Sequence, residues 1–259
     1  MAKRIGIALI ALLWSLPLHV AGETYGCGQF PLLHDSIPKE QRAEMLLKRA
    51  LTCVTEGKPL QSIALFSELI GLQPDNLDAY LNRGSAYIQS GQFELGVADF
   101  SHVISVKPDA IAAWYNRGTA FVVARQYDRA IADLSEAIRL KPDNARAFCN
   151  RALAYLRKSD YDNALKDLAA GIEKDARLPF CYYVRGDLYL KKAAYQKAVE
   201  DLTQSLLLKP DNPAGLVTRG QAYEHLGERE KALADFKAAV AIDPRLKVAK
   251  EGVQRLTHN

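Results

Sequence analysis

The feature that most constrains this chain is a spacing of 34 residues that recurs along most of its 259 residues. Proline, small, aromatic and aliphatic residues each keep that interval. One copy of such a pattern is too short to bury its apolar surface alone, so it must pack against neighbouring copies. The spacing therefore predicts an array of stacked units. The recurring residues include Pro74, Pro108, Pro142, Pro210 and Pro244, then Gly84, Gly118, Ala152, Gly186 and Gly220, then Tyr87, Phe121, Tyr155, Tyr189 and Tyr223, and then Gly96, Ala130, Ala164, Ala198 and Ala232.

Each unit is predicted to contain two helices. Residues 77–90 and residues 93–107 each carry apolar side chains at helical spacing. Gly91 lies between them and favours a helix end, because glycine adopts left-handed backbone angles at little cost. The Asp-Asn pair at 75–76 is suited to cap the first helix, and Pro108 prevents the second helix from continuing.

The small residues at fixed positions are predicted to mark helix crossings. Paired helices usually lie about 8–10 Å apart. Gly118 on a first helix and Ala130 on the following second helix are placed to allow a closer approach of the two backbones. We therefore expect these positions to tolerate no larger side chain.

One copy carries the pattern most fully, and the match is made by Trp114, Gly118, Phe121, Ala130, Leu134, Ala137 and Pro142. This pattern resembles the tetratricopeptide repeat, a helix-turn-helix unit of 34 residues. The resemblance implies an all-α fold, an α-solenoid in which stacked units form a right-handed superhelix. Clear units are predicted at 77–110, 111–144, 145–178, 179–212 and 213–246, with a divergent unit at 43–76, an N-terminal segment at 23–42 and a C-terminal capping helix at 247–259.

Residues 1–22 are predicted to be a signal peptide. A basic start, an apolar stretch and the small residues that end at Gly22 indicate export and cleavage. The apolar stretch is shorter than the roughly 20 residues of a membrane span, so no stable span is expected after cleavage. An uncleaved N-terminal anchor is the alternative. The chain is therefore predicted to be periplasmic or secreted.

Charge and motifs exclude several classes of function. Cleavage after Gly22 removes Lys3 and Arg4, so the formal net charge of +4 falls by two, which is too little to predict a nucleic-acid partner. The sequence holds no phosphate-binding loop and no motif of a hydrolase or a metalloprotease. We therefore predict a protein that is not an enzyme, with no catalytic residue, no metal site and no cofactor.

Four cysteines, Cys27, Cys53, Cys149 and Cys181, allow three disulfide pairings, and export permits disulfides. None of the four has the spacing of a redox motif or of a zinc site. For Cys149 and Cys181, buried free thiols and a disulfide remain equally open. Cys53 stands where the other units have an aromatic ring.

Each clear unit also places an arginine 16 residues before an aspartate, one on each predicted helix. We favour a ladder of structural ion pairs, within or between units, over a ligand site. The pairs are Arg83 and Asp99, Arg117 and Asp133, Arg151 and Asp167, Arg185 and Asp201, and Arg219 and Asp235.

The resemblance also implies a binding site. In proteins of this family the first helices line a concave groove that holds extended peptides or partner helices. The positions that match the groove include Asn82, Tyr115, Asn116, Thr119, Arg146, Cys149, Asn150, Leu153, Arg157, Phe180, Tyr183 and Asp187. The chain is thus expected to be an interaction scaffold or adaptor. The alternatives are a chaperone-like holder of exported proteins, a groove covered by the termini of the chain, and self-association.

Within that groove, two groups of residues receive specific roles. Phe180 and Tyr183 are predicted to be binding anchors, since they lie off the core stripe of their helix. Asn82, Asn116 and Asn150 recur at 34-residue intervals. They resemble the asparagine ladder with which certain family members hold the backbone of a peptide.

Overall fold

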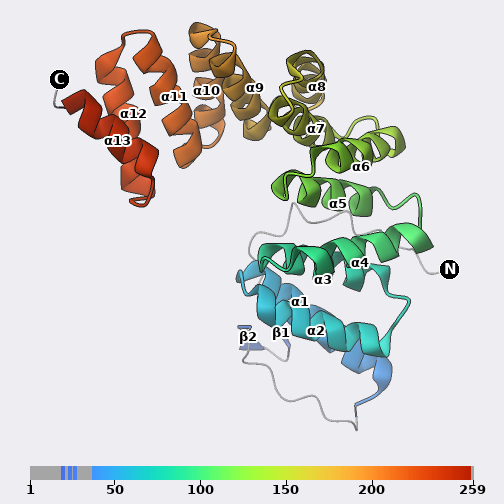
Figure 1. Cartoon of the computed structure of the whole chain (residues 1–259). Coiled ribbons are helices and arrows are strands. Elements are labelled where there is room, and N and C mark those ends of the chain that lie inside the picture. Colours follow the sequence, from blue (N-terminus) through green and yellow to red (C-terminus); the bar gives the residue numbers. More distant parts are fainter. Residues whose placement is uncertain (1–18, 21–22, 25, 28–36, 258–259) are drawn as a thin grey trace. The chain divides into compact units, whose positions relative to one another are not determined.

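The computed structural model describes residues 19–20, 23–24, 26–27 and 37–257. The predicted signal peptide, except for two of its residues, lies outside this part of the chain. The chain divides into two compact bodies, Met1–Val106 and Lys107–Asn259. Each is described by itself below as the N-terminal body and the C-terminal body (Figure 1).

The N-terminal body contains a short antiparallel hairpin and two helix pairs. In the hairpin, His19 pairs with Thr24 and Val20 pairs with Glu23. Helix α1 begins at Lys39, inside the stretch that was predicted as an N-terminal segment, and Pro38 precedes it as the N-cap. Its elements are β1 (His19–Val20), β2 (Glu23–Thr24), α1 (Lys39–Thr55), α2 (Pro59–Leu72), α3 (Leu77–Gln89) and α4 (Phe93–Val106).

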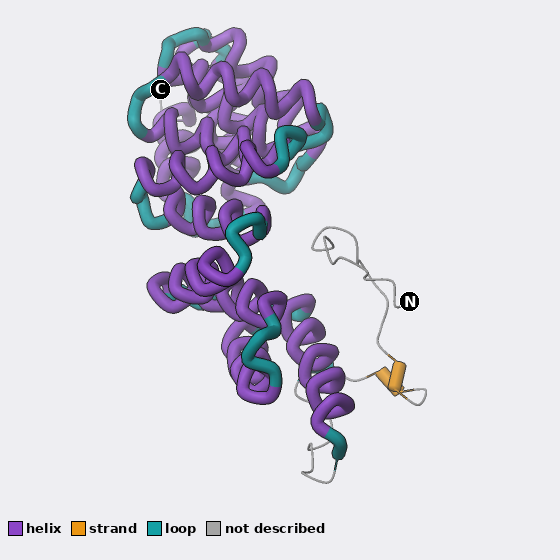
Figure 2. Tube along the Cα trace, turned by 90° about the vertical axis from the view of Figure 1, so that its right-hand side faces the viewer, coloured by secondary structure: helices purple, strands orange, loops and turns teal. Residues whose placement is uncertain are grey.

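The C-terminal body contains four helix pairs and one further helix. Figure 2 shows that helices and short loops make up the described chain apart from β1 and β2. The pairs follow the 34-residue spacing, so the predicted helix-turn-helix units are observed. The helices are α5 (Ile111–Val123), α6 (Tyr127–Leu140), α7 (Ala145–Arg157), α8 (Tyr161–Lys174), α9 (Pro179–Lys191), α10 (Tyr195–Leu208), α11 (Pro213–His225), α12 (Arg229–Ile242) and α13 (Lys247–Thr257).

The turn inside each helix pair has one conformation that recurs every 34 residues. Gly91 has a φ of 81° there, as its position in the sequence predicted. The same left-handed conformation is adopted without glycine by Arg125, Ser159 and Ala193, with φ values of 59°, 63° and 57°. Because a side chain disfavours this region, the packing of the two helices must impose it.

Helix starts and helix crossings also follow the sequence. The side chain of Asn76 accepts a hydrogen bond from the Ala79 backbone N–H at 3.0 Å and so caps α3. At the crossing of α5 and α6, a Cβ on Gly118 would lie 2.8 Å from Leu134 Cγ. That distance is too short for two carbon atoms, so glycine is required for the observed approach of these helices.

The five arginine–aspartate pairs form within their repeat units. Arg151 donates from Nε and from one terminal nitrogen to the two carboxylate oxygens of Asp167, both at 2.7 Å. The other four pairs have the same two-pronged geometry. The structural interpretation of this ladder is therefore confirmed, and each pair joins the first helix of a unit to its second helix.

No helix in the described part of the chain is long and apolar enough to span a membrane.

Candidate binding face

In the C-terminal body, the predicted site residues lie along one side of the first helices α5, α7 and α9. Successive first helices contact one another, and residues three or four apart on a helix share a face. We call this surface the first-helix face. It consists of Tyr115, Asn116 and Thr119 on α5, Arg146, Asn150, Leu153 and Arg157 on α7, and Phe180, Tyr183 and Asp187 on α9.

Polar groups on this face connect one first helix to the next. The Asn150 side-chain amide donates to the Tyr115 hydroxyl at 3.2 Å and to the Arg146 carbonyl oxygen at 2.9 Å. Arg157 donates to a carboxylate oxygen of Asp187 at 3.2 Å. These contacts join α5 to α7 and α7 to α9, so they stiffen the face.

The same type of contact continues towards the C-terminus. Burial raises the pKa of the Tyr183 hydroxyl, and the nearby Asp187 charge raises it further, while a hydrogen bond with Thr218 on α11 and the charge of Arg157 oppose the shift. Beyond α11, Arg255 of α13 makes two hydrogen bonds to the Glu224 carboxylate, at 2.9 and 2.7 Å. Sequence reasoning missed both contacts, because neither repeats at 34 residues.

These hydrogen bonds limit which of the three predicted asparagines could hold the backbone of a peptide. Asn150 is only 9% exposed, and both its amide hydrogens are used inside the protein. Only its side-chain oxygen remains to accept a bond from a peptide. Asn116 is half-buried, and among the described residues its amide has no partner. Asn82 lies in the N-terminal body, where its amide donates to the Asp78 carbonyl oxygen at 2.7 Å.

Two other predicted residues are well placed to contact a partner. The Phe180 side chain is 36% exposed, and the exposed Arg146 guanidinium has no acidic partner among the described residues. Tyr183 is half-buried and packs against the core of the neighbouring helices. Leu153 likewise packs against the core beside it. The buried Thr119 hydroxyl has no hydrogen-bond partner within the described chain.

Cys149 does not line the face, which corrects the prediction from the repeat register. It is fully buried and forms a disulfide with Cys181, so α7 and α9 are covalently joined, with 5.2 Å between the two Cα atoms. The pairing that the sequence left open is thus settled, and the free-thiol alternative is wrong. Spacing could not reveal this bond, since Cys181 occupies a different repeat position from Cys149.

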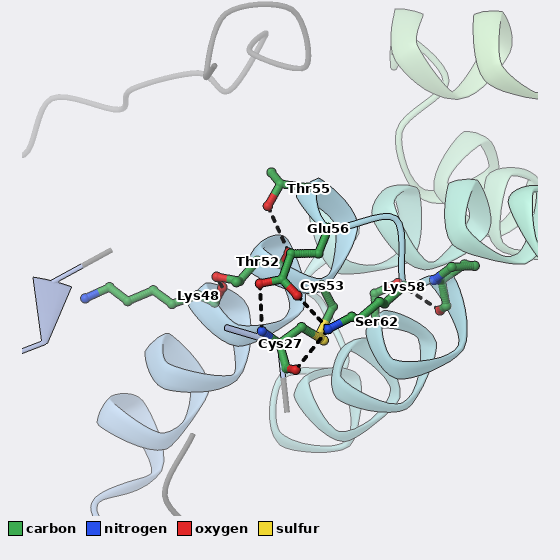
Figure 3. Close-up of a disulfide and its surroundings, with 9 residues drawn as sticks. Cys27, Lys48, Thr52, Cys53, Thr55, Glu56, Lys58 and Ser62 are labelled. Carbon is green, nitrogen blue, oxygen red and sulfur yellow. Dashed lines mark hydrogen bonds and ion pairs between the residues drawn. A yellow bond between two sulfur atoms is a disulfide. The ribbon is translucent and has the colours of Figure 1, made fainter. Parts of the chain in front are cut away.

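The second disulfide joins Cys27 to Cys53 on α1 and fastens the residue at position 27 to the end of the first helix pair (Figure 3). The Cys27 N–H donates to the Glu56 carboxylate at 2.8 Å, and Lys58 donates to the Cys27 carbonyl oxygen at 3.3 Å. Lys58 also contacts the Glu56 carboxylate at 2.7 Å. This bond is the main cause that lowers the pKa of Glu56, and the bond from the Cys27 N–H lowers it further. The disulfide takes the place of the aromatic ring that this divergent unit lacks.

Small-molecule and metal sites are not evident in the described residues. No group of three or more potential metal ligands occurs among them. A shallow hollow of about 270 Å³ lies between α12 and α13, lined by Lys237, Val240, Lys250, Val253 and Gln254. None of the predicted site residues lines this hollow.

Models of the tetratricopeptide repeat match the chain at residues 77–110 and 145–175, at residues 126–159 and at residues 186–256. No curated protein sequence matches it significantly. Matches to solved structures are numerous, and their low identities make them a statement about the fold.

Three of these structures illustrate the likeness. A tetratricopeptide repeat protein from Parabacteroides merdae is 22% identical, has a TM-score of 0.69 and covers 84% of each chain. PilF of Pseudomonas aeruginosa is 16% identical with a TM-score of 0.69, over 84% of this chain and 99% of that one. YrrB, described as a TPR protein with an unusual peptide-binding site, is 19% identical with a TM-score of 0.52, over 73% of this chain and 97% of that one.

Proposed function

We propose, from the premise that the chain belongs to the tetratricopeptide repeat family, that it is an interaction scaffold whose first-helix face holds a peptide or a helix of a partner protein. The family fold supports an interaction role in general, and the peptide-binding site described for YrrB is a precedent on a similar fold. The assignment of particular residues to contacts with the partner is part of this proposal.

The observation that carries the proposal is that Phe180 and Arg146 are exposed on a surface whose helices are joined by hydrogen bonds. Phe180 is 36% exposed, and exposed aromatic residues are typical anchors at protein interfaces. Arg146 supplies an unpaired positive charge on the adjacent first helix. Around them, the bonds from Asn150 to Tyr115 and from Arg157 to Asp187 hold the helices in place. A surface that is already ordered loses less entropy when a partner binds.

A site-specific crosslinking experiment tests this role. A photoreactive phenylalanine analogue is placed at Phe180 in the full chain, and a matched variant carries it at Lys166, an exposed residue on α8 outside the first-helix face. Irradiation in the native host should give one or a few discrete products from position 180 and none of these from position 166. Equal products from both positions would contradict the proposal.

The same experiment separates the scaffold from the chaperone-like alternative. A scaffold selects its partner and gives discrete crosslinked species. A holder of unfolded chains gives a continuous distribution of products that grows when exported proteins are made to misfold. Substitution of Arg146 by Glu should reduce the discrete products, because a charged partner group would then meet a repelling charge.

We also propose that the protein is exported, as the N-terminal sequence predicts. All four cysteines are paired in disulfides, and such bonds persist mainly in oxidising compartments. The test is mass spectrometry of the protein from its native host. We expect a mature N-terminus at Glu23 and no alkylation of cysteine unless the protein is first reduced. An intact Met1 with freely alkylated cysteines would overturn the proposal.

A further inference from the structure

The junction between α8 and α9 lacks a hydrogen bond that other junctions of the C-terminal body possess. Arg151 donates from its remaining terminal nitrogen to the Ser135 hydroxyl on the preceding second helix, at 2.8 Å. Arg219 does the same with Thr203, at 3.1 Å. At the equivalent place before Arg185 the chain has Ala169, which has no hydroxyl group. The bond between adjacent repeats is therefore absent at this junction.

The packing at this junction is also reduced. Helices α8 and α9 share a smaller interface than α6 and α7 or α10 and α11, which are the corresponding helices of the neighbouring repeats. The sequence between α8 and α9 has Ala176 where the repeat pattern has proline. The ordinary contacts between repeats are thus weakest where the first-helix face passes from α7 to α9.

A disulfide lies at this same place. Cys149 and Cys181 are both fully buried, and they belong to one core cluster with Leu156, Val184 and Leu188. Their bond connects α7 directly to α9. The disulfide joins the two first helices α7 and α9, whereas the missing hydrogen bond would have joined the second helix α8 to α9.

The surrounding sequence makes room for this bond. A Cβ on Gly171 of α8 would lie 2.5 Å from the Cys149 sulfur, well inside van der Waals contact. At the same repeat position the neighbouring second helices carry Ala137, Ser205 and Ala239. The glycine thus occurs where the sulfur occupies the space of a side chain.

We propose that the Cys149–Cys181 disulfide, accommodated by Gly171, is the positioning element of the first-helix face. It sets α7 against α9, and so it fixes Arg146 relative to Phe180. This inference rests on the proposed function, because it assigns the disulfide a role in partner binding. The physical reason is that a cross-link removes alternative arrangements of the two helices, and a surface with fewer arrangements binds more tightly.

Hydrogen exchange on the full chain tests the positional half of this inference without any partner. The variant Cys149→Ala/Cys181→Ala is compared with wild type and with the matched control Cys27→Ala/Cys53→Ala. The control removes a disulfide of similar sequence separation, 26 against 32 residues, in the other body. We expect amides of α7 and α9 to exchange about 30-fold faster or more in the first variant, the lower end of the typical effect of losing a cross-link. In the control they should exchange as in wild type.

The binding half is tested by the crosslink at position 180 in the same three backgrounds. Loss of Cys149–Cys181 should lower the yield of discrete products about fivefold, while the control should retain it. If exchange rises in α7 and α9 but the yield is unchanged, the bond only stabilises the fold and the positioning role is overturned. Equal effects of both disulfides overturn it too. If wild type gives no discrete product, the proposed function fails, while the exchange data still decide whether the bond fixes α7 against α9.

Further comparisons keep the inference testable. Ala169→Ser in the Cys149→Ala/Cys181→Ala background offers Arg185 the missing hydroxyl group, and it should restore part of the slow exchange and of the crosslink yield. Ala169→Val is its control of similar size and should restore neither. If the double cysteine variant fails to fold, the wild-type chain is compared before and after complete reduction of its disulfides. Reduction breaks the bond between α7 and α9, so it should give the same faster exchange in these two helices. Unchanged exchange of α7 and α9 in the fully reduced chain would overturn the inference.

Discussion

Replacing Arg151 by methionine tests how strongly the arginine–aspartate pairs hold a repeat together. The arginine makes three hydrogen bonds: two to Asp167 at 2.7 Å and one to Ser135 at 2.8 Å. The Asp167 side chain is only 8% exposed, against 18% for Arg151. The hydrogen bond that Arg151 donates to Asp167 is the largest cause that raises the pKa of Arg151, so the cation persists throughout the ordinary pH range.

The expected loss of stability follows from the carboxylate that the substitution leaves behind. Removal of one partner of a buried ion pair typically destabilises a protein by about 3–5 kcal/mol. We expect Arg151→Met to lower the free energy of unfolding by about 3 kcal/mol. The double variant Arg151→Met/Asp167→Leu should lose about 1 kcal/mol, since no charge is then left unpaired.

The matched control is Arg185→Met, because Arg185 pairs with Asp201 but has no hydroxyl partner on the preceding helix. Arg185→Met should lower the free energy of unfolding by about 1 kcal/mol less than Arg151→Met does, because about 1 kcal/mol is the usual contribution of one hydrogen bond. Urea unfolding followed by circular dichroism measures each variant, and an unchanged slope against urea shows that the same transition is compared. A loss of less than about 0.5 kcal/mol in the free energy of unfolding for Arg151→Met would refute the structural role of the ion pair. So would a loss in the double variant that equals the sum of the losses for Arg151→Met and Asp167→Leu measured singly.

Four other outcomes are expected. Ala193→Gly should raise the free energy of unfolding by up to about 1 kcal/mol, because Ala193 has a φ of 57°; a decrease in a urea titration would show that this strain is not relieved. Gly118→Leu should lower it by about 1–3 kcal/mol or more through overpacking against α6, and an unchanged melting temperature would contradict the helix crossing. Phe180→Ala should leave the melting temperature nearly unchanged and reduce capture of the crosslinked partner, whereas a large loss of stability would assign Phe180 to the core. Burial raises the pKa of Tyr183, so its contribution to stability is present below about pH 10 and is lost as the pH rises through the higher folded value. The stability of Tyr183→Phe should therefore fall less steeply in that range, and an identical fall would show that Tyr183 is not responsible.

The fold could be predicted from the sequence because its determinants are local and repeated. Asn76 caps a helix, Gly91 ends one and Gly118 permits a crossing, each through contacts between residues that lie close together in the sequence. The arginine–aspartate spacing of 16 residues also lies within a unit, so the ion pairs were predictable from the register alone. Five copies of the same local arrangement leave little room for another interpretation.

The candidate site was less predictable, because its side chains are determined by contacts between repeats. The repeat register alone predicted Cys149 and Asn150 on the first-helix face. Cys149 instead forms a buried disulfide, and the Asn150 amide donates a hydrogen bond to Tyr115 of the preceding repeat. The contacts from Tyr115 to Asn150 and from Arg157 to Asp187 join residues 35 and 30 positions apart. Such separations carry no repeating signal in the sequence, since each contact depends on two residues that occur together only once.

The regularity of the repeat makes its departures informative, because each unit serves as a control for the others. Three departures fall in one short stretch. Position 169 has alanine where neighbouring units have a residue with a hydroxyl group, position 171 has glycine where they have a residue with a side chain, and position 176 has alanine where they have proline. A glycine inside a helix alone lowers stability by about 1 kcal/mol relative to alanine, and a lost hydrogen bond adds a similar amount. A disulfide that closes a loop of this length contributes about 3–4 kcal/mol, which exceeds the two losses together. Several weak contacts are thus replaced by one covalent bond. We therefore expect reduction to loosen α7 against α9 more than the neighbouring repeats, which keep their hydrogen bonds.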